Sequence, residues 1–334
     1  MNDPLISIVM PAYNAEKYIG QAIESIMHQS FSNWEIVIVD DSSTDNTTVI
    51  ISEFQTIDNR IRSIRLDKNT GACYVPREKA VKLAKGDYVL LLDSDDYLDE
   101  QYIEMSLNRL SATGADTVLG VMNIMSESGN VCLNTVPARD FDLSVVLKGS
   151  EAFRLTIPWK IGLNGMVTKR ECFLNALIQN ENMFKGVYGD ELCVRRCLSN
   201  STLVAFSSAK YFYRSNPTSL VHHFSPRIFD MFAAYSDVKK AVNELYPNDE
   251  QLKVNVEIFM FSGFKYVFNQ YMRNIGEISS SNRQIYKNRF KQWYNSIEWG
   301  IYPPPSIQSR LLETNGFWLF YNYRLLVRLL RGPN

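Results

Sequence analysis

Four short β-like runs in the first hundred residues, most of them apolar, limit what this 334-residue chain can fold into. Each run is followed by a polar loop or a stretch in which apolar residues recur at helical spacing. Largely unbroken apolar runs are typical of parallel strands that are buried on both faces. Strands that alternate with helices in this way predict an α/β fold with a mostly parallel sheet flanked by helices. The four runs are LISIVM (5–10), WEIVIVD (34–40), IRSIRL (61–66) and DYVLLLD (87–93).

The later part of the chain follows a looser pattern. A helix is expected over about 101–112, and TVLGVMNI with VCLNTV is typical of an antiparallel hairpin around the turn ESGN. TLVAF and KYFYR are expected as two further strands, and the pattern becomes helical and aromatic-rich from about residue 226. We therefore expect one domain over residues 1–225 and a helical C-terminal region over residues 226–334.

Composition and charge exclude several classes of function. The 35 Lys+Arg and 36 Asp+Glu residues give a formal net charge of -1, which favours neither a nucleic-acid binder nor an acidic tail protein. The five cysteines show no zinc-site spacing and are expected as free thiols in a reducing compartment. Neither a signal peptide nor an apolar run of about 18 residues is present, so a cytoplasmic location is expected.

Polar residues gather where the expected strands end. Ligands of open parallel sheets bind at the carboxyl ends of the strands, so these residues are expected to meet at one edge. Acids, a ring and a basic residue at such an edge suit a nucleotide diphosphate held with Mg²⁺ or Mn²⁺, because these cations bridge carboxylates to phosphates. The sequences involved are PAYN (11–14), DDSS (40–43), NTG (69–71) with Arg77 after it, and DSDD (93–96).

Several motifs together resemble the inverting family-2 glycosyltransferases, whose nucleotide-sugar domain has the Rossmann-like GT-A fold. SIVMPAYNAEKYIGQAIESIMHQSFSNWEIVIVDDSSTDNT, followed by GDYVLLLDSDDYL, carries the resemblance, which extends over roughly residues 5–220. The loop NTGACYVPREKA resembles a Gly/Ala-rich family loop in which the usual ARNxG is altered to VPREKA. The resemblance implies sugar transfer from a nucleotide-diphosphate donor, expected to be a UDP-sugar, in bacterial surface polysaccharide synthesis.

The resemblance also implies roles for individual residues at the donor side. It assigns base contacts to Pro11, Tyr13 and Asp41, and a phosphate contact to Arg77. Asp93 and Asp95 would form the DxD motif, which touches the ribose and a Mn²⁺ or Mg²⁺ ion. Asp95 is the preferred metal ligand, and Asp96 is the alternative. Downstream, YFYRSNPTSLVHH resembles a segment that covers the diphosphate, which makes Arg214 and Ser219 candidates for phosphate contact and His222 or His223 candidates for metal binding.

The catalytic base is expected in the segment YGDELCVRR. Relatives use a carboxylate of a G-E-D-like motif to deprotonate the acceptor hydroxyl, whose oxygen then displaces the diphosphate with inversion. The two acids are swapped here, so position favours Glu191 and side-chain type favours Asp190. Glu191 is preferred, and Asp190 stays open. Trp159 and Asn164 are candidates for the acceptor pocket, with ordinary core packing as the alternative.

Other interpretations stay open for the same residues. The DSDD run also fits a solvated turn with capping acids, and Asp190 with Glu191 fits the acids favoured in the first turn of a helix. A haloacid-dehalogenase-type phosphatase would also place D-x-D after a strand, but Tyr97 stands where that class has Thr or Val. A third hypothesis is a nucleotide- or glycan-binding module that has lost turnover.

The C-terminal region carries an excess of basic residues. Residues 281–334 contain eight Lys and Arg but two acids, and Arg324, Arg328 and Arg331 recur at i, i+4, i+7. This stripe favours a helix that lies on the inner face of the cell membrane near a lipid-linked acceptor. The alternative is a terminal helix docked on its own domain or on a second subunit of a homo-oligomer. The expected partners are thus a nucleotide sugar and a glycan or lipid-linked acceptor.

Overall fold

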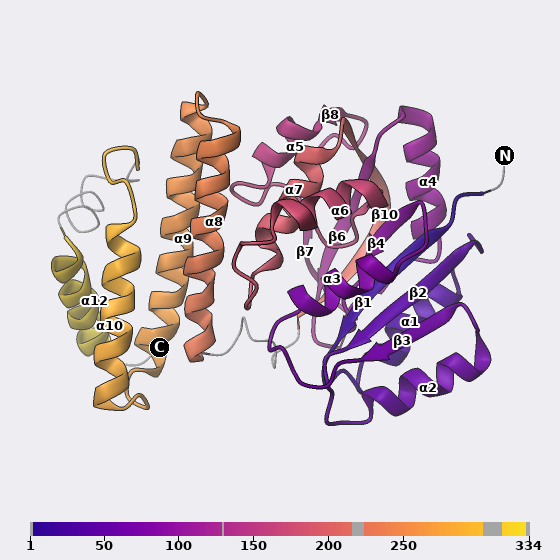
Figure 1. Cartoon of the computed structure of the whole chain (residues 1–334). Coiled ribbons are helices and arrows are strands. Elements are labelled where there is room, and N and C mark those ends of the chain that lie inside the picture. The colour runs from indigo at the N-terminus through magenta and orange to yellow at the C-terminus, as the bar shows by residue number, and fades with distance from the viewer. Residues whose placement is uncertain (1–2, 129, 216–223, 303–315, 332–334) are drawn as a thin grey trace. The chain divides into compact units, whose positions relative to one another are not determined.

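The computed structural model describes residues 3–128, 130–215, 224–302 and 316–331, with side chains given up to residue 324 (Figure 1). The chain divides into two compact units, residues 1–217 and 218–334. The first unit holds the sheet, and the second contains only helices within its described residues.

The first unit is built on a ten-stranded sheet in the order β3-β2-β1-β4-β9-β6-β10-β5, with β7 beside β6 and β8 beside β10. The chain therefore has the expected α/β fold, and the parallel part is its N-terminal half. The strands are β1 (Ile6–Ala12), β2 (Trp34–Asp40), β3 (Ile61–Arg65), β4 (Tyr88–Leu91), β5 (Tyr97–Leu98), β6 (Thr117–Met125), β7 (Cys132–Val136), β8 (Val146–Lys148), β9 (Val167–Lys169) and β10 (Leu203–Arg214).

The four N-terminal strands, β3, β2, β1 and β4, are parallel; β1 and β2 are buried along their whole length, whereas the edge strand β3 is only partly buried. Ile8 of β1 pairs in register with Ile36 on one side and Leu90 on the other. Ile8 belongs to one core cluster and its neighbour Val9 to the cluster on the opposite face. Because successive side chains of a strand point to opposite faces, a strand between two helical layers needs apolar residues at every position.

The C-terminal half of the sheet is mixed. β9 lies antiparallel between β4 and β6, whereas β6 and β10 are parallel. The expected hairpin is present as the antiparallel pair β6 and β7. The two strands expected at TLVAF and KYFYR are wrong as separate elements, because they form the single strand β10. A shift in register between Phe206 and Lys210 interrupts its pairing with β6, which explains why the sequence pattern breaks there.

Helices cover both faces of the sheet. Residues of α1, α2 and α4 pack in the core cluster with Ile8, and residues of α3, α5, α6 and α7 pack in the cluster with Val9 (Figure 1). The loops that enter α3 and α7 therefore come to the carboxyl ends of the parallel strands. The helices are α1 (Ile19–Met27), α2 (Thr47–Ile57), α3 (Tyr74–Leu83), α4 (Tyr102–Thr113), α5 (Gly149–Leu155), α6 (Arg170–Gln179) and α7 (Asp190–Asn200).

The second unit packs its helices around aromatic side chains. Phe264 and Phe268 of α9 are fully buried, and Phe268 contacts Phe290 of α10 and Phe320 of α12 edge-on. Such large rings bury much apolar surface each. Its elements are the 3₁₀ turn η1 (Pro226–Phe229) and the helices α8 (Asp230–Leu245), α9 (Glu250–Asn274), α10 (Ser280–Asn295) and α12 (Phe317–Arg331).

Helix α12 docks on its own unit along one side. Phe320 and Tyr321 are buried, and Arg324 hydrogen-bonds Asn269 of α9 on that same side. Arg324, the first residue of the expected basic stripe, therefore lies on the docked side of the helix. The exposed side carries Trp318 and Leu319 instead. No helix among the described residues is long and apolar enough to cross a membrane.

Candidate active site

The loops after β1 and β2 are tied together at the carboxyl edge of the sheet. The backbone N–H of Asn14 donates to Ser43 Oγ at 3.0 Å, and the N–H of Thr44 donates to Asn14 Oδ1 at 2.8 Å. Pro11 is buried within this edge, whereas the ring of Tyr13 is 48% exposed. Tyr13 is therefore accessible to a flat ligand, whereas Pro11 is packed inside the protein.

Asp41 is buried and fixes the loop that leads to α3. Its carboxylate accepts hydrogen bonds at 2.9 Å from both the backbone N–H and the hydroxyl of Thr70. Asp41 thereby joins the end of β2 to the loop NTG that the sequence placed at the same edge. A base N–H at this position would share the carboxylate with Thr70.

The three aspartates after β4 have different surroundings. Asp96 is turned into the protein, where it accepts from Tyr211 Oη at 2.6 Å and from the backbone N–H of Arg214 at 2.8 Å. Burial raises the pKa of Asp96 well above its ordinary value, and the charges of Asp95 and Asp93 add to the rise. Asp96 is thus held by the fold, while Asp93 and Asp95 are only partly buried.

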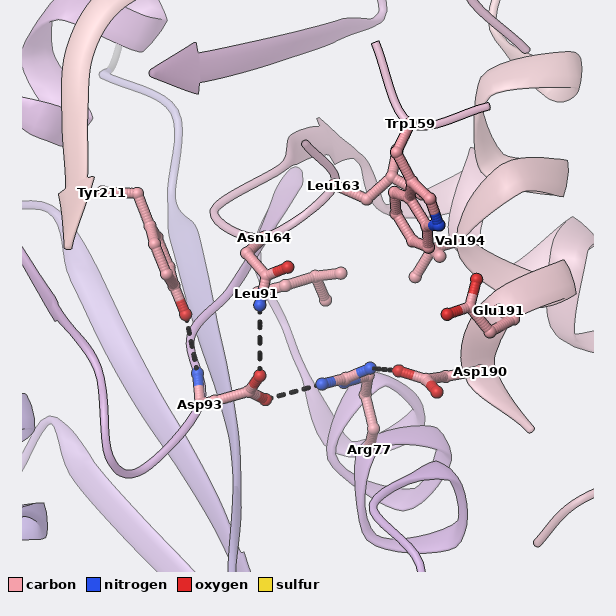
Figure 2. A pocket seen from close by; sticks show the side chains of 10 residues that line it. All are labelled: Arg77, Leu91, Asp93, Trp159, Leu163, Asn164, Asp190, Glu191, Val194 and Tyr211. Atoms are coloured by element: carbon pink, nitrogen blue, oxygen red, sulfur yellow. Dashed lines mark hydrogen bonds and ion pairs between the residues drawn. The ribbon is translucent and has the colours of Figure 1, made fainter. Parts of the chain in front are cut away.

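Arg77 is the positive partner of the aspartate run. Its Nη2 donates to Asp93 Oδ1 at 2.6 Å, and its Nη1 forms an ion pair with Asp190 at the start of α7 (Figure 2). Asn164 Nδ2 lies 3.3 Å from the other oxygen of Asp93. The guanidinium is buried, so it holds two carboxylates from different parts of the chain in one place.

The loop that carries Asn164 is fixed by Gly165. Gly165 has a φ of +74°, and a Cβ on it would clash with the rings of Tyr102 and Tyr211. Its N–H donates to the carbonyl of Leu91 at 3.1 Å, and its carbonyl accepts from Tyr102 Oη at 2.7 Å. Only glycine satisfies this close approach without strain, and the approach brings Asn164 against the end of β4.

Asp190 and Glu191 occupy the first turn of α7, but they have different partners. Glu191 forms an ion pair with Arg195 one turn further along the helix, whereas Asp190 is paired with Arg77. Burial raises the pKa of Glu191 above its ordinary value, Arg195 opposes the rise, and the charge of Asp190 adds to it. The raised pKa makes Glu191 easier to protonate than an ordinary glutamate, and a general base must take up a proton.

These groups line one cavity of about 90 Å³ at the carboxyl ends of the strands (Figure 2). A single water needs about 10–15 Å³ of such space, so the cavity admits a hydroxyl-bearing group together with solvent. Acidic, basic, amide and aromatic groups converge there from separate elements. The lining residues are Arg77, Leu91, Asp93, Trp159, Leu163, Asn164, Asp190, Glu191, Val194 and Tyr211.

Other predicted site residues lie outside this cavity. The guanidinium of Arg214 is bound within the protein, where it donates to the carbonyls of Asp95 and Glu127 at 3.0 and 2.9 Å and to Gln21. It also lies 4.9 Å from the ring centre of Tyr18. The other candidates, Ser219, His222 and His223, lie outside the described residues.

The donor set for a divalent cation consists of carboxylate oxygens at the end of β4. Asp93 and Asp95 supply the hard oxygen ligands that Mg²⁺ and Mn²⁺ take, and both are partly exposed at the edge where a phosphate would arrive. Within the described ranges, no group of three or more His, Cys, Asp and Glu side chains is arranged to hold a metal ion. Two carboxylates do not make a complete metal site, so a cation bound here would need further ligands from a diphosphate.

Sequence reasoning missed two residues that organise the cavity. Arg195 is fully buried and contacts Glu191, and its position four residues after Glu191 was the available signal, because such pairs are neighbours on a helix. Tyr211 of β10 donates to Asp96 and lines the cavity. Its contacts span more than a hundred residues of sequence, so local pattern carried no signal for it.

Comparisons with known proteins converge on one family. Residues 7–134 match the sequence profile described as "Glycosyl transferase family 2". The chain is 30% identical over 224 residues to "Glycosyltransferase GlyG" of Streptococcus pneumoniae, which covers 65% of this chain and 73% of that protein. It is 29% identical over 208 residues to the Escherichia coli "UDP-Glc:alpha-D-GlcNAc-diphosphoundecaprenol beta-1,3-glucosyltransferase WfgD", covering 61% of this chain and 81% of that protein.

A solved structure also shares the fold. The crystal structure of S. aureus TarS 1-349 in complex with UDP-GlcNAc superposes with a TM-score of 0.67 at 18% sequence identity. The match covers 89% of this chain and 82% of that chain. It extends beyond the nucleotide-sugar domain expected from the sequence and includes part of the helical C-terminal region.

Proposed function

The chain belongs to glycosyl transferase family 2, and from that premise we propose that it transfers a sugar from a nucleotide-diphosphate donor to an acceptor hydroxyl by single displacement with inversion. The enzyme is a glycosyltransferase, and the proposal concerns its substrates and mechanism. One observation carries it. Asp93, expected at the donor, and the acid pair Asp190–Glu191, expected at the acceptor, line the same cavity. Donor and acceptor groups can therefore meet there.

The proposed donor is a UDP-sugar and the proposed acceptor a glycan or a lipid-linked saccharide of a bacterial surface polysaccharide. The name of the relative WfgD gives UDP-Glc as its donor and a diphosphoundecaprenol-linked GlcNAc as its acceptor. TarS, whose fold this chain shares, was solved with UDP-GlcNAc bound. The exposed ring of Tyr13 and the buried carboxylate of Asp41 suit a nucleobase at the edge of the sheet.

In the proposed reaction Glu191 accepts the proton of the acceptor hydroxyl. The acceptor oxygen forms a bond to the anomeric carbon on the face opposite the diphosphate, and the bond from that carbon to the diphosphate oxygen breaks. The pKa of Glu191, raised mainly by burial, brings the base closer to the working pH of a cytoplasmic enzyme. Asp190 pairs with Arg77 and so holds the start of α7 against the donor side.

Asp95, with Asp93, is proposed to hold a Mn²⁺ or Mg²⁺ ion. When bound, such an ion would offset negative charge on the diphosphate. Asp93 shares its carboxylate with Arg77 and Asn164. Asp95 is the ligand that the position of the DxD motif favours.

A thermal-shift screen followed by product analysis tests the proposal. UDP, GDP, ADP and CDP are compared with and without Mn²⁺, and the matching nucleotide sugars are then offered with a panel of p-nitrophenyl glycosides. We expect stabilisation by UDP that requires metal, since a ligand of the folded state raises its stability. A β-linked product from a UDP-α-sugar, measured by proton NMR, is expected. An α-linked product would contradict single displacement, and the absence of any turnover would favour a binding module.

We also propose peripheral membrane contact through the outer side of α12. Trp318 and Leu319 are 44% and 49% exposed, and Lys287 and Lys291 of α10 lie 4.5 and 5.8 Å from the ring centre of Trp318. Aromatic and cationic side chains together are typical of surfaces that lie on anionic lipid. The Trp318→Ser, Leu319→Ser double variant should lose co-sedimentation with vesicles that contain phosphatidylglycerol. Undiminished binding by this variant would contradict the proposal.

A further inference from the structure

The base candidate Glu191 shares a buried cation with an exposed aromatic ring. Arg195 has no exposed surface, and its Nη1 bonds both the carboxylate of Glu191 and, at 2.7 Å, the Glu191 carbonyl. The Glu191 side chain itself is 14% exposed. A buried arginine with so few orientations fixes the carboxylate that it contacts.

Arg195 is itself anchored from the segment that follows α5. Its Nε donates to Thr156 Oγ1 at 3.1 Å, and Thr156 is fully buried and donates in turn to the carbonyl of Phe153 at 2.7 Å. This chain of contacts ties the guanidinium to α5, so Arg195 cannot follow a movement of the Glu191 side chain.

Trp159 lies against the same guanidinium. Its ring centre is 4.5 Å from Cζ of Arg195, within the range of a cation–π contact. Trp159 is 44% exposed and lines the cavity beside Glu191 (Figure 2). An open aromatic ring beside a carboxylate base suits a sugar, whose C–H groups pack on the ring while a hydroxyl reaches the carboxylate.

From these contacts we propose that Arg195 is the positioning residue of Glu191 and that Trp159, stacked on the same guanidinium, is the platform on which the acceptor sugar lies. The inference rests on the proposed function and deepens it. It assigns the acceptor side of the cavity to the α5–β9 segment and α7, opposite the donor side at Asp93. The acceptor class that fits is a pyranoside presenting one apolar face.

The charges around Glu191 give this arrangement a measurable consequence. Asp190 and Arg195 face it from α7, Arg77 faces it from α3, and Asp93 lies beyond Arg77. Arg195 is the strongest influence that lowers the pKa of Glu191. Removing the Arg195 charge should therefore raise that pKa further, and a base is active only above its pKa.

The first test is the pH dependence of kcat/KM for the full-length chain with UDP-glucose or UDP-N-acetylglucosamine, whichever stabilises the protein. Arg195→Met should move the acid limb upward by about 1–3 pH units, the effect of losing an opposite charge at close range. Arg195→Lys should return the acid limb most of the way to its wild-type pH. Arg196→Met is the matched control, because Arg196 is also buried but bonds the carbonyl of Gln179. It should leave the limb in place.

The second test separates the acceptor platform from stability. Trp159→Ala should lower the ratio of transfer to a p-nitrophenyl glycoside over donor hydrolysis by about tenfold, and Trp159→Phe by less. Stabilisation by UDP should not change in either variant. This test stands even where Arg195→Met does not fold.

Two outcomes would overturn the inference. One is a folded, active Arg195→Met whose acid limb coincides with that of the wild type, and the other is an unchanged transfer ratio in Trp159→Ala. Failure of the proposed function looks different, because the wild type would then transfer no sugar from any nucleotide sugar. A dead Glu191→Gln with an unshifted Arg195→Met defeats only the positioning role.

Discussion

Nη2 of Arg77 lies 2.6 Å from Oδ1 of Asp93, and the same guanidinium also pairs with Asp190. Asp93 follows β4 and Asp190 begins α7, so one buried arginine joins the donor side of the cavity to the acid pair expected to act on the acceptor. One buried side chain therefore contacts both halves of the site.

Replacing Arg77 should damage both stability and donor binding. Arg77→Met leaves Asp93 and Asp190 without their cation in a partly buried place. Breaking a buried pair costs about 3–5 kcal/mol, and we expect the lower end or less because both acids are about a quarter exposed. The loss is measured as the free energy of unfolding in urea. Stabilisation by UDP with Mn²⁺ should also disappear.

Lys82→Met provides the matched control. Lys82 lies on the same helix as Arg77 and pairs with Glu78 at 2.6 Å, but its side chain is 59% exposed. Exposed pairs contribute about 0–1 kcal/mol, so this variant should stay close to the wild type. Equal losses in the two variants would contradict the special role of Arg77.

Asp95→Asn should abolish the metal-dependent part of donor binding. A neutral amide is a poor ligand for a hard divalent cation, whereas contacts to the nucleobase stay intact. Titration calorimetry with UDP should therefore give the same weak affinity with and without Mn²⁺. The control is Asp99→Asn just after β5, where the carboxylate accepts a backbone hydrogen bond from Gln101 at 3.2 Å. Retained metal dependence in Asp95→Asn would remove Asp95 from the proposed metal site.

Glu35→Gln should destabilise the fold in a pH-dependent way. Burial acts to raise the pKa of Glu35, but hydrogen bonds from Ser7, the Lys85 N–H and Arg62 outweigh it and lower the pKa. A lowered carboxyl pKa adds stability above the unfolded pKa, and this stability is lost as pH falls through the folded value. The deficit of Glu35→Gln, about 1–3 kcal/mol near pH 7, should shrink below about pH 4.3. A deficit that is constant with pH would contradict the charged role.

The strands and the sheet edge could be predicted because they follow from local patterns. The apolar runs gave the four parallel strands, and the rule for parallel sheets brought Asp41, Arg77 and Asp93 to one edge. The sequence also predicts a Mn²⁺ or Mg²⁺ ion at the DSDD run. In the structure Arg77 pairs with Asp93, and Asp96 is buried and bonded by Tyr211.

The rest of the site depends on contacts between distant parts of the chain. Tyr211 meets Asp96, and Thr156 meets Arg195, through packing that no local periodicity encodes. The single strand β10 was missed because its register shift between Phe206 and Lys210 breaks the alternation of side chains.

The proposed mechanism depends most on Glu191 as the base, and paired substitutions in α7 test this role directly. Glu191→Gln and Asp190→Asn are compared for transfer from the UDP-sugar that stabilises the wild type, with binding measured in parallel. We expect Glu191→Gln to bind the donor like the wild type and to lose transfer by about 10²–10⁴-fold, the usual contribution of a general base. Full transfer by Glu191→Gln, together with an inactive Asp190→Asn, would contradict the account.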